Sequence, residues 1–100
     1  MAPHPMDPER ERLHAENRLI LHLNEAMSFR DTKQMRELLV EYRKLDPKDV
    51  EANQAGYAII IDCIDHPGEA ALAAAHDFDD TQRQSPLRRF VRRICFDNTN

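Results

Sequence analysis

The clearest periodic pattern of apolar positions lies between residues 32 and 45. Apolar side chains stand at positions 35, 38, 39, 42 and 45, and charged side chains fill the opposite side. Spacings of three and four residues predict an amphipathic helix with a solvated charged face. Asp31 or Thr32 is the candidate N-cap, because a short side chain with an oxygen can accept a hydrogen bond from the free amides of the first turn.

A longer helix is predicted before it, over about residues 8–29, and the segment 30–32 separates the two. Its apolar positions recur at the same helical spacing, which indicates a stripe along one side of the helix. That stripe comprises Leu13, Leu19, Ile20, Leu23, Ala26 and Met27.

The third predicted helix, over about residues 50–64, is apolar on nearly every side. Asp46-Pro47 ends the preceding helix, because proline disfavours the helical conformation of the residue before it. Between residues 55 and 64 only Asp62 is charged. A helix without a polar face requires neighbours around it, so we expect this segment to be the central element of the fold.

Two more helices are predicted in the last third of the chain. One covers about residues 69–77, with Pro67 suited to its first turn, and the polar residues 79–84 predict a loop after it. Ser85-Pro86 then predicts the start of a last helix that ends near Phe96. Its apolar seam comprises Leu87, Phe90, Val91, Ile94 and Cys95, and its opposite side, the arginine face, comprises Arg88, Arg89, Arg92 and Arg93.

These elements predict an all-α fold of four to five helices in a single helical domain over residues 9–96. An extended proline-rich leader is expected over residues 1–8 and a polar tail over residues 97–100. Hydrophobic residues make up 41% of the chain and charged residues 32%, a balance that favours a soluble globular protein over a disordered one. No run of 18 apolar residues occurs, so no membrane span is predicted.

The segment MRELLVEYRKLDPKDVEANQAGY, residues 35–57, resembles the join between two tetratricopeptide repeats. In that family a 34-residue helix–turn–helix unit ends on a leucine and an acid–proline turn, and the next unit opens with a Leu-Gly pair. Leu45 with Asp46-Pro47 matches the first feature, and Ala55-Gly56 resembles the second. The resemblance covers about residues 14–80. It implies antiparallel helical hairpins stacked as a short solenoid with the last helix as its cap, and an ordinary helical bundle is the alternative.

The resemblance also implies a function, because tetratricopeptide repeats bind peptides or partner domains in a groove lined by their first helices. We therefore expect a non-enzymatic interaction or scaffold module for another protein or a peptide. Ordinary packing of the groove residues, or a homodimer that hides the apolar ones, stays open. By position, the groove residues of this chain are Asn17, Ile20, Asn24, Asn53, Tyr57 and Ile60.

Cys63 and Cys95 both fall on apolar seams, one on the central helix and one on the last helix. If those helices pack together, the two thiols can form a disulfide that closes a loop of about 33 residues and stabilises the fold by roughly 3–4 kcal/mol. Two buried, reduced thiols are the alternative. A disulfide would favour a periplasmic or secreted protein, and reduced thiols a cytoplasmic one.

The arginine face supports a second hypothesis, which is binding of nucleic acid or of an acidic partner. Residues 83–93 hold five arginines and no acid, although the whole chain has a net charge of −4. The acidic remainder of the chain argues against nucleic acid, as does the lack of exposed aromatic side chains to stack on bases.

The sequence holds no pattern that predicts catalysis. A glycine-rich phosphate loop, a nucleophile elbow and a dinucleotide fingerprint are all missing. The Cys63–His66 spacing is half of a zinc motif, but a zinc site needs about four ligands and no second cluster follows. We therefore predict no catalytic residue, no metal site and no cofactor.

Overall fold

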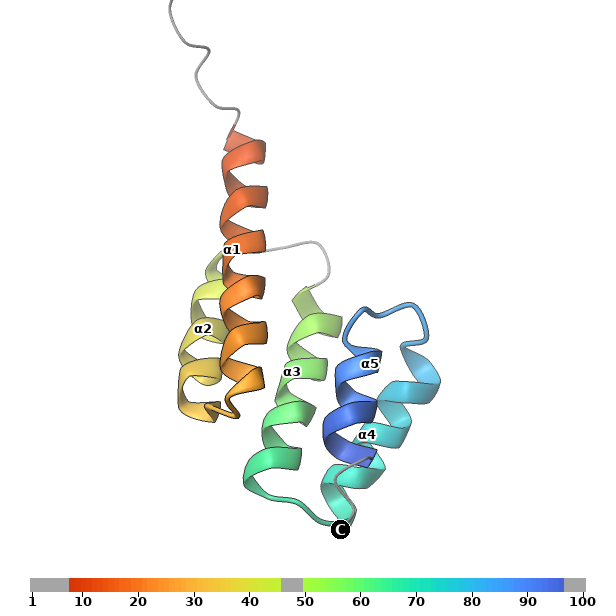
Figure 1. Ribbon diagram of the computed structural model, residues 1–100. Helices are drawn as coiled ribbons and strands as arrows, with labels where there is room; N and C mark the ends of the chain where they lie inside the picture. The colour runs from red at the N-terminus through yellow and green to blue at the C-terminus, as the bar shows by residue number, and fades with distance from the viewer. Residues whose placement is uncertain (1–7, 46–49, 97–100) are drawn as a thin grey trace, which may run out of the picture. The chain divides into compact units, whose positions relative to one another are not determined.

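A computed structural model of the protein describes residues 8–45 and 50–96, and all the regular structure in these residues is helical (Figure 1). The predicted all-α fold of four to five helices is confirmed. The chain divides into two compact units, residues 1–47 and 48–100. The single helical domain over residues 9–96 stays a prediction. The helices are α1 Pro8–Ser28, α2 Thr32–Lys44, α3 Val50–Asp65, α4 Glu69–Thr81, α5 Arg88–Val91 and the π-helical turn η1 Arg92–Phe96.

The first unit is a hairpin in which α1 packs against α2. Arg30 adopts a left-handed conformation with φ of 55°. The amide of Arg30 donates to the carbonyl of Met27 at 3.0 Å, and the amide of Asp31 donates to the carbonyl of Ala26 at 2.9 Å. These two bonds form a Schellman motif, which ends α1 sharply. Asp31 then caps α2, because its carboxylate accepts from the amide of Gln34 at 3.1 Å, as the sequence predicted.

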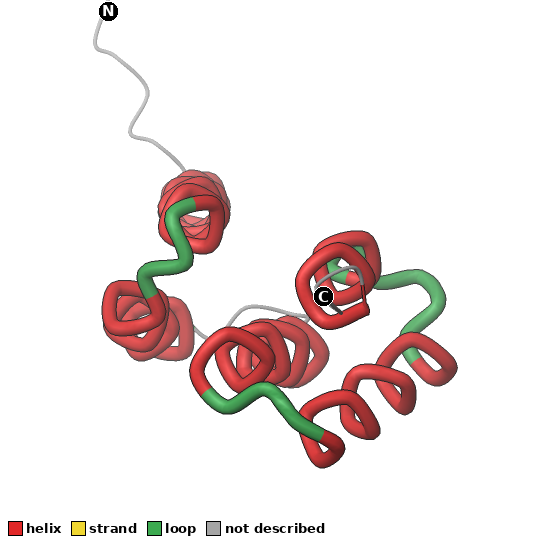
Figure 2. Tube along the Cα trace, turned by 60° about the horizontal axis from the view of Figure 1, so that its bottom comes forward, coloured by secondary structure: helices red, strands yellow, loops and turns green. Residues whose placement is uncertain are grey.

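The second unit contains α3, α4 and the terminal helix, the name used here for α5 followed by η1. Each of the three contacts the other two, and Figure 2 shows them at the corners of a triangle. The predicted apolar seam of the terminal helix faces this core, since Leu87, Val91 and Ile94 are buried. The last helix therefore lies over the central one, as the sequence predicted.

The terminal helix begins later than predicted, at Arg88 rather than Ser85. The hydroxyl of Ser85 accepts from the amide of Leu87 at 3.2 Å, so Ser85 orders the turn before the helix. At its other end Phe96 stacks on His76 of α4, with ring centroids 4.5 Å apart. Pro67 also precedes its helix, because Gly68 is the residue that caps α4.

Gly56 of α3 provides the space into which the start of the terminal helix fits. A methyl group built at this glycine would lie 2.8 Å from Leu87 Cδ1 and 3.0 Å from Phe78 Cζ. By resemblance, Gly56 was matched to the glycine of the Leu-Gly pair that opens a repeat. In the second unit its close neighbours are instead two buried side chains, from α4 and from the turn that leads into α5.

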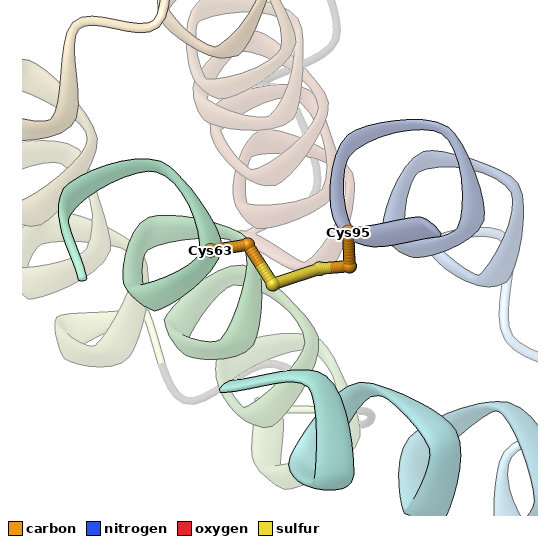
Figure 3. Close-up of a disulfide and its surroundings, with 2 residues drawn as sticks. All are labelled: Cys63 and Cys95. Carbon is orange, nitrogen blue, oxygen red and sulfur yellow. A yellow bond between two sulfur atoms is a disulfide. The ribbon is translucent and has the colours of Figure 1, made fainter. Parts of the chain in front are cut away.

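A disulfide joins Cys63 of α3 to Cys95 of η1, which confirms the pairing that the sequence favoured (Figure 3). The two Cα atoms lie 5.4 Å apart, and the bond spans 32 residues of chain. Cross-linking a loop of this length restricts the unfolded state and is worth roughly 3–4 kcal/mol in the chain-entropy model. The terminal helix is thereby fixed at its C-terminal end.

The stacking of two tetratricopeptide-like hairpins stays a prediction. The acid–proline turn that the resemblance relies on, Asp46-Pro47, lies outside the described residues, and so do the leader up to residue 7 and the polar tail. What the described residues contain is a hairpin in one unit and a three-cornered packing of α3, α4 and the terminal helix in the other.

Serine substitutions at Gly56 and at Gly68 distinguish a glycine needed for close packing from one that only caps a helix. Gly56→Ser should lower the free energy of unfolding by about 2 kcal/mol, because the added atoms overpack the contact with Leu87 and Phe78. Gly68→Ser should raise it by a few tenths of a kcal/mol, because Gly68 caps α4 without a side-chain hydrogen bond and nothing lies near its Cα. Urea unfolding followed by circular dichroism measures both. Equal effects would contradict the close packing at Gly56.

Candidate anion-binding site

Helix α4 extends further than the sequence predicted, to Thr81 rather than to about residue 77. The run Asp79 to Gln84 looks like a loop by composition, but the structure places its first residues in the helix. The added turn presents Phe78 and Asp79 to the interior, and Asp79 is only 9% exposed. The polar residues stay helical because Phe78 packs near Gly56 and Asp79 finds two cationic partners.

The carboxylate of Asp79 binds two arginines of the terminal helix. Arg88 donates from Nε to Oδ1 at 2.7 Å. Arg92 donates from Nε to Oδ1 at 2.7 Å and from Nη2 to Oδ2 at 3.1 Å, which makes its contact bidentate. Arg88 and Arg92 are four residues apart and thus neighbours on one side of the helix. One acid of α4 therefore holds two adjacent guanidiniums in fixed orientations.

This cluster keeps Asp79 ionised over the whole ordinary pH range. Hydrogen bonds from Arg92 and then from Arg88 lower the pKa of the carboxyl from 3.8 to about 2, against the opposing effect of burial. The same hydrogen bond raises the pKa of Arg92. Since all these groups are charged at neutral pH, the single negative charge of Asp79 offsets only part of the positive charge around it.

The four residues of the arginine face line one open hollow of about 400 Å³. The side chains of Arg88 and Arg92 are 30% and 54% exposed, so both reach solvent although they bind Asp79. Arg89 and Arg93 are exposed, and neither makes a hydrogen bond or ion pair with another described residue. Of the four arginines that line the hollow, two are oriented by Asp79 and two have no partner among the described residues.

The arginine face was predicted as a basic patch, whereas Asp79 was placed in a predicted loop. A signal for it exists. Ala71, Ala75 and Phe78 form an apolar stripe on α4, and Asp79 falls four residues after Ala75 on the same side. An acid that continues an apolar stripe, followed by two arginines spaced by four, indicates a buried ion pair rather than a loop.

The predicted groove residues differ in exposure and lie on helices of two different units. Asn17 is exposed, and Ile20 and Asn24 are half-buried, all on α1 of the first unit. On α3 of the second unit Asn53 is half-buried, while Tyr57 is 1% and Ile60 0% exposed. Because α3 is apolar on nearly all sides, positions that the resemblance assigned to a groove belong to the core. Tyr57 and Ile60 are therefore not available to a partner.

The rest of the described chain offers little chemistry. Both cysteines are consumed by the disulfide, and in residues 8–45 and 50–96 no group of three His, Cys, Asp or Glu side chains could hold a metal ion. A smaller hollow of about 290 Å³ lies beside the disulfide and is mainly apolar, with Glu69 as its one charged lining residue. None of the described helices is long and apolar enough to cross a membrane.

Comparison with known proteins assigns no function to the arginine face. No protein-family model, curated protein or solved structure matches this chain. The tetratricopeptide-like interpretation accordingly remains a prediction from the residues that carry the resemblance.

Removing the carboxyl charge tests the cluster through the pH dependence of stability. Asp79→Asn should melt at a lower temperature than the wild type above about pH 4, because the folded state holds Asp79 as a carboxylate. The folded pKa is lowered, so this stabilisation is present above the ordinary pKa and is lost as protons bind between about pH 4 and pH 2. The two melting temperatures should therefore converge as the pH falls through this range.

Thermal melts followed by circular dichroism measure this convergence. Asp80→Asn is the matched control, because Asp80 is the exposed neighbour of Asp79 on the same helix. A gap between wild type and Asp79→Asn that stays constant down to about pH 2 would show that the two arginines do not hold the carboxyl in its ionised form.

Proposed function

We propose that this protein is a non-enzymatic interaction module that binds an acidic segment of a partner protein through its arginine face. The observation that carries the proposal is the convergence of Arg88, Arg89, Arg92 and Arg93 on one hollow, with Asp79 fixing two of them. Arginine side chains lose much conformational entropy on binding, and prior fixation reduces that cost. The proposal keeps the interaction function that the sequence predicted and moves its surface from the groove to the terminal helix.

The terminal helix is held firmly enough to serve as a binding surface. Leu87 fits against Gly56 at its start, Asp79 binds two of its arginines, and the disulfide fixes Cys95 near its end. A helix of so few residues is not stable alone in water, so these contacts rather than helix propensity maintain the spacing of the arginines. A surface with fixed charge spacing favours recognition of a defined partner over diffuse attraction.

A protein partner accounts for the surroundings of the hollow better than a nucleic acid does. Single-stranded nucleic acids bind basic grooves that also offer exposed aromatic faces for base stacking. In the described part of the second unit, Tyr57 and Phe78 belong to the core, and Phe90 and Phe96 are half-buried, Phe96 against His76. The cationic groups also cluster in one hollow instead of extending along a track for a phosphate backbone.

A fluorescent glutamate-rich peptide titrated with the full chain tests this function by anisotropy. We expect binding that weakens as salt is added, and a loss of about tenfold in affinity for Arg89→Gln/Arg93→Gln, because these two arginines hold no structural partner among the described residues. Arg83→Gln is the matched control, since Arg83 is exposed and lies outside the hollow. It should bind nearly as the wild type does.

Three outcomes would count against the proposal. The first is no binding of the peptide even at low salt. The second is an equal loss for Arg83→Gln, which would indicate general charge attraction rather than a site. The third is tighter binding of a single-stranded DNA of matched charge, which would favour the nucleic-acid alternative.

A further inference from the structure

We propose that the hollow of the arginine face is a site for a phosphate monoester dianion, so that the acidic partner is recognised through a phosphorylated side chain. This inference rests on the proposed function and specifies its ligand. It follows from three properties of the hollow, which are the orientation of its donors, its charge and its size.

The donors are arranged for a compact oxyanion with several acceptor oxygens. Asp79 accepts from Nε of both Arg88 and Arg92 and from Nη2 of Arg92, so it orders both guanidinium planes. A guanidinium has five N–H donors, and most of those on the two side chains stay available to a ligand. A phosphate offers three terminal oxygens and is matched by the planar fork of arginine, whereas a carboxylate offers two oxygens to one fork.

The charge of the cluster favours a dianion over a single carboxylate. Four guanidiniums surround the hollow, and Asp79 is the one carboxylate that pairs with any of them in the described residues. A glutamate side chain would add one negative charge and leave most of the repulsion between the arginines in place. A phosphate monoester carries a charge of about −1.5 to −2 at neutral pH and relieves more of that repulsion in the same space.

The hollow is open to solvent and has room for a phosphate group. A volume of about 400 Å³ accepts a phosphate group together with part of the side chain that bears it. Arg88 and Arg92 are held by Asp79, whereas Arg89 and Arg93 are exposed, have no partner among the described residues and can adjust to the group. The site therefore combines a fixed half with an adaptable half.

Isothermal titration calorimetry of the full chain with matched peptides tests the inference. One peptide carries phosphoserine within an acidic sequence, and a second carries two glutamates there so that the net charges match. We expect the phosphoserine peptide to bind at least tenfold more tightly, and we expect Arg89→Gln/Arg93→Gln to abolish this preference. Arg83→Gln should retain it, and circular dichroism verifies that all variants fold.

A charge-conserving variant distinguishes the effect of the forked arginine donors from the effect of their positive charge. Arg89→Lys/Arg93→Lys keeps both positive charges but removes the forked donors. It should weaken binding of both peptides, and the loss in affinity should be several-fold larger for the phosphoserine peptide than for the glutamate peptide. No loss for either peptide would mean that charge alone governs the site, and equal losses would mean that the forked donors do not distinguish phosphate from carboxylate; both results would overturn the inference.

The outcomes distinguish this inference from the proposed function. Equal affinity for the two peptides would overturn phosphate recognition and leave acidic-segment binding standing. Failure of both peptides to bind would overturn the two together. Binding of phenyl phosphate without any gain for the phosphoserine peptide would overturn the assignment to a partner's side chain and point to a small phosphate ester instead.

Discussion

The shared ion pair at Asp79 is the interaction on which the arrangement of the second unit depends. Arg88 and Arg92 are neighbours on one side of a short helix, and two like charges at this spacing repel each other. The carboxylate of Asp79 accepts from both and converts a repulsive pair into an oriented one. It also links the last turn of α4 to the terminal helix. The same contact therefore positions the terminal helix and orients two arginines of its arginine face.

The terminal helix is secured at three successive points. Leu87 packs against Gly56 at its start, Asp79 binds Arg88 and Arg92 along its length, and Cys95 is bonded to Cys63 near its end. A small unit buries too little apolar surface to hold such a short helix by packing alone, and a disulfide is a common remedy. A disulfide favours a periplasmic or secreted protein over a cytoplasmic one, and that location stays a prediction.

The structure could be predicted from the sequence wherever a local pattern of residues determines it. The apolar spacing predicted α2 and α3 to within a residue or two, and Cys63 and Cys95 could be paired because both fall on apolar seams. The end of α4 was not predicted, because the residues around Asp79 are polar and are helical where Asp79 pairs with arginines of the next helix; the spacing of Asp79 after Ala71 and Ala75 was the signal for it. Tyr57 and Ile60 were assigned to a groove by resemblance, whereas the apolar surroundings of α3 place them in the core. The hollow itself arises when an acid from one helix meets arginines from another, which no single segment encodes.

Hydrogen exchange of the Nε–H groups of the arginine face, followed by nuclear magnetic resonance, measures most directly whether Asp79 holds Arg88 and Arg92. Our account predicts that the Nε–H protons of Arg88 and Arg92 exchange slowly with water, because both donate to Asp79, while those of Arg89 and Arg93 exchange rapidly. In Asp79→Asn the slow pair should lose its protection and the rapid pair should not change. Four arginines that exchange alike in the wild type, or a slow pair that survives in Asp79→Asn, would contradict the account.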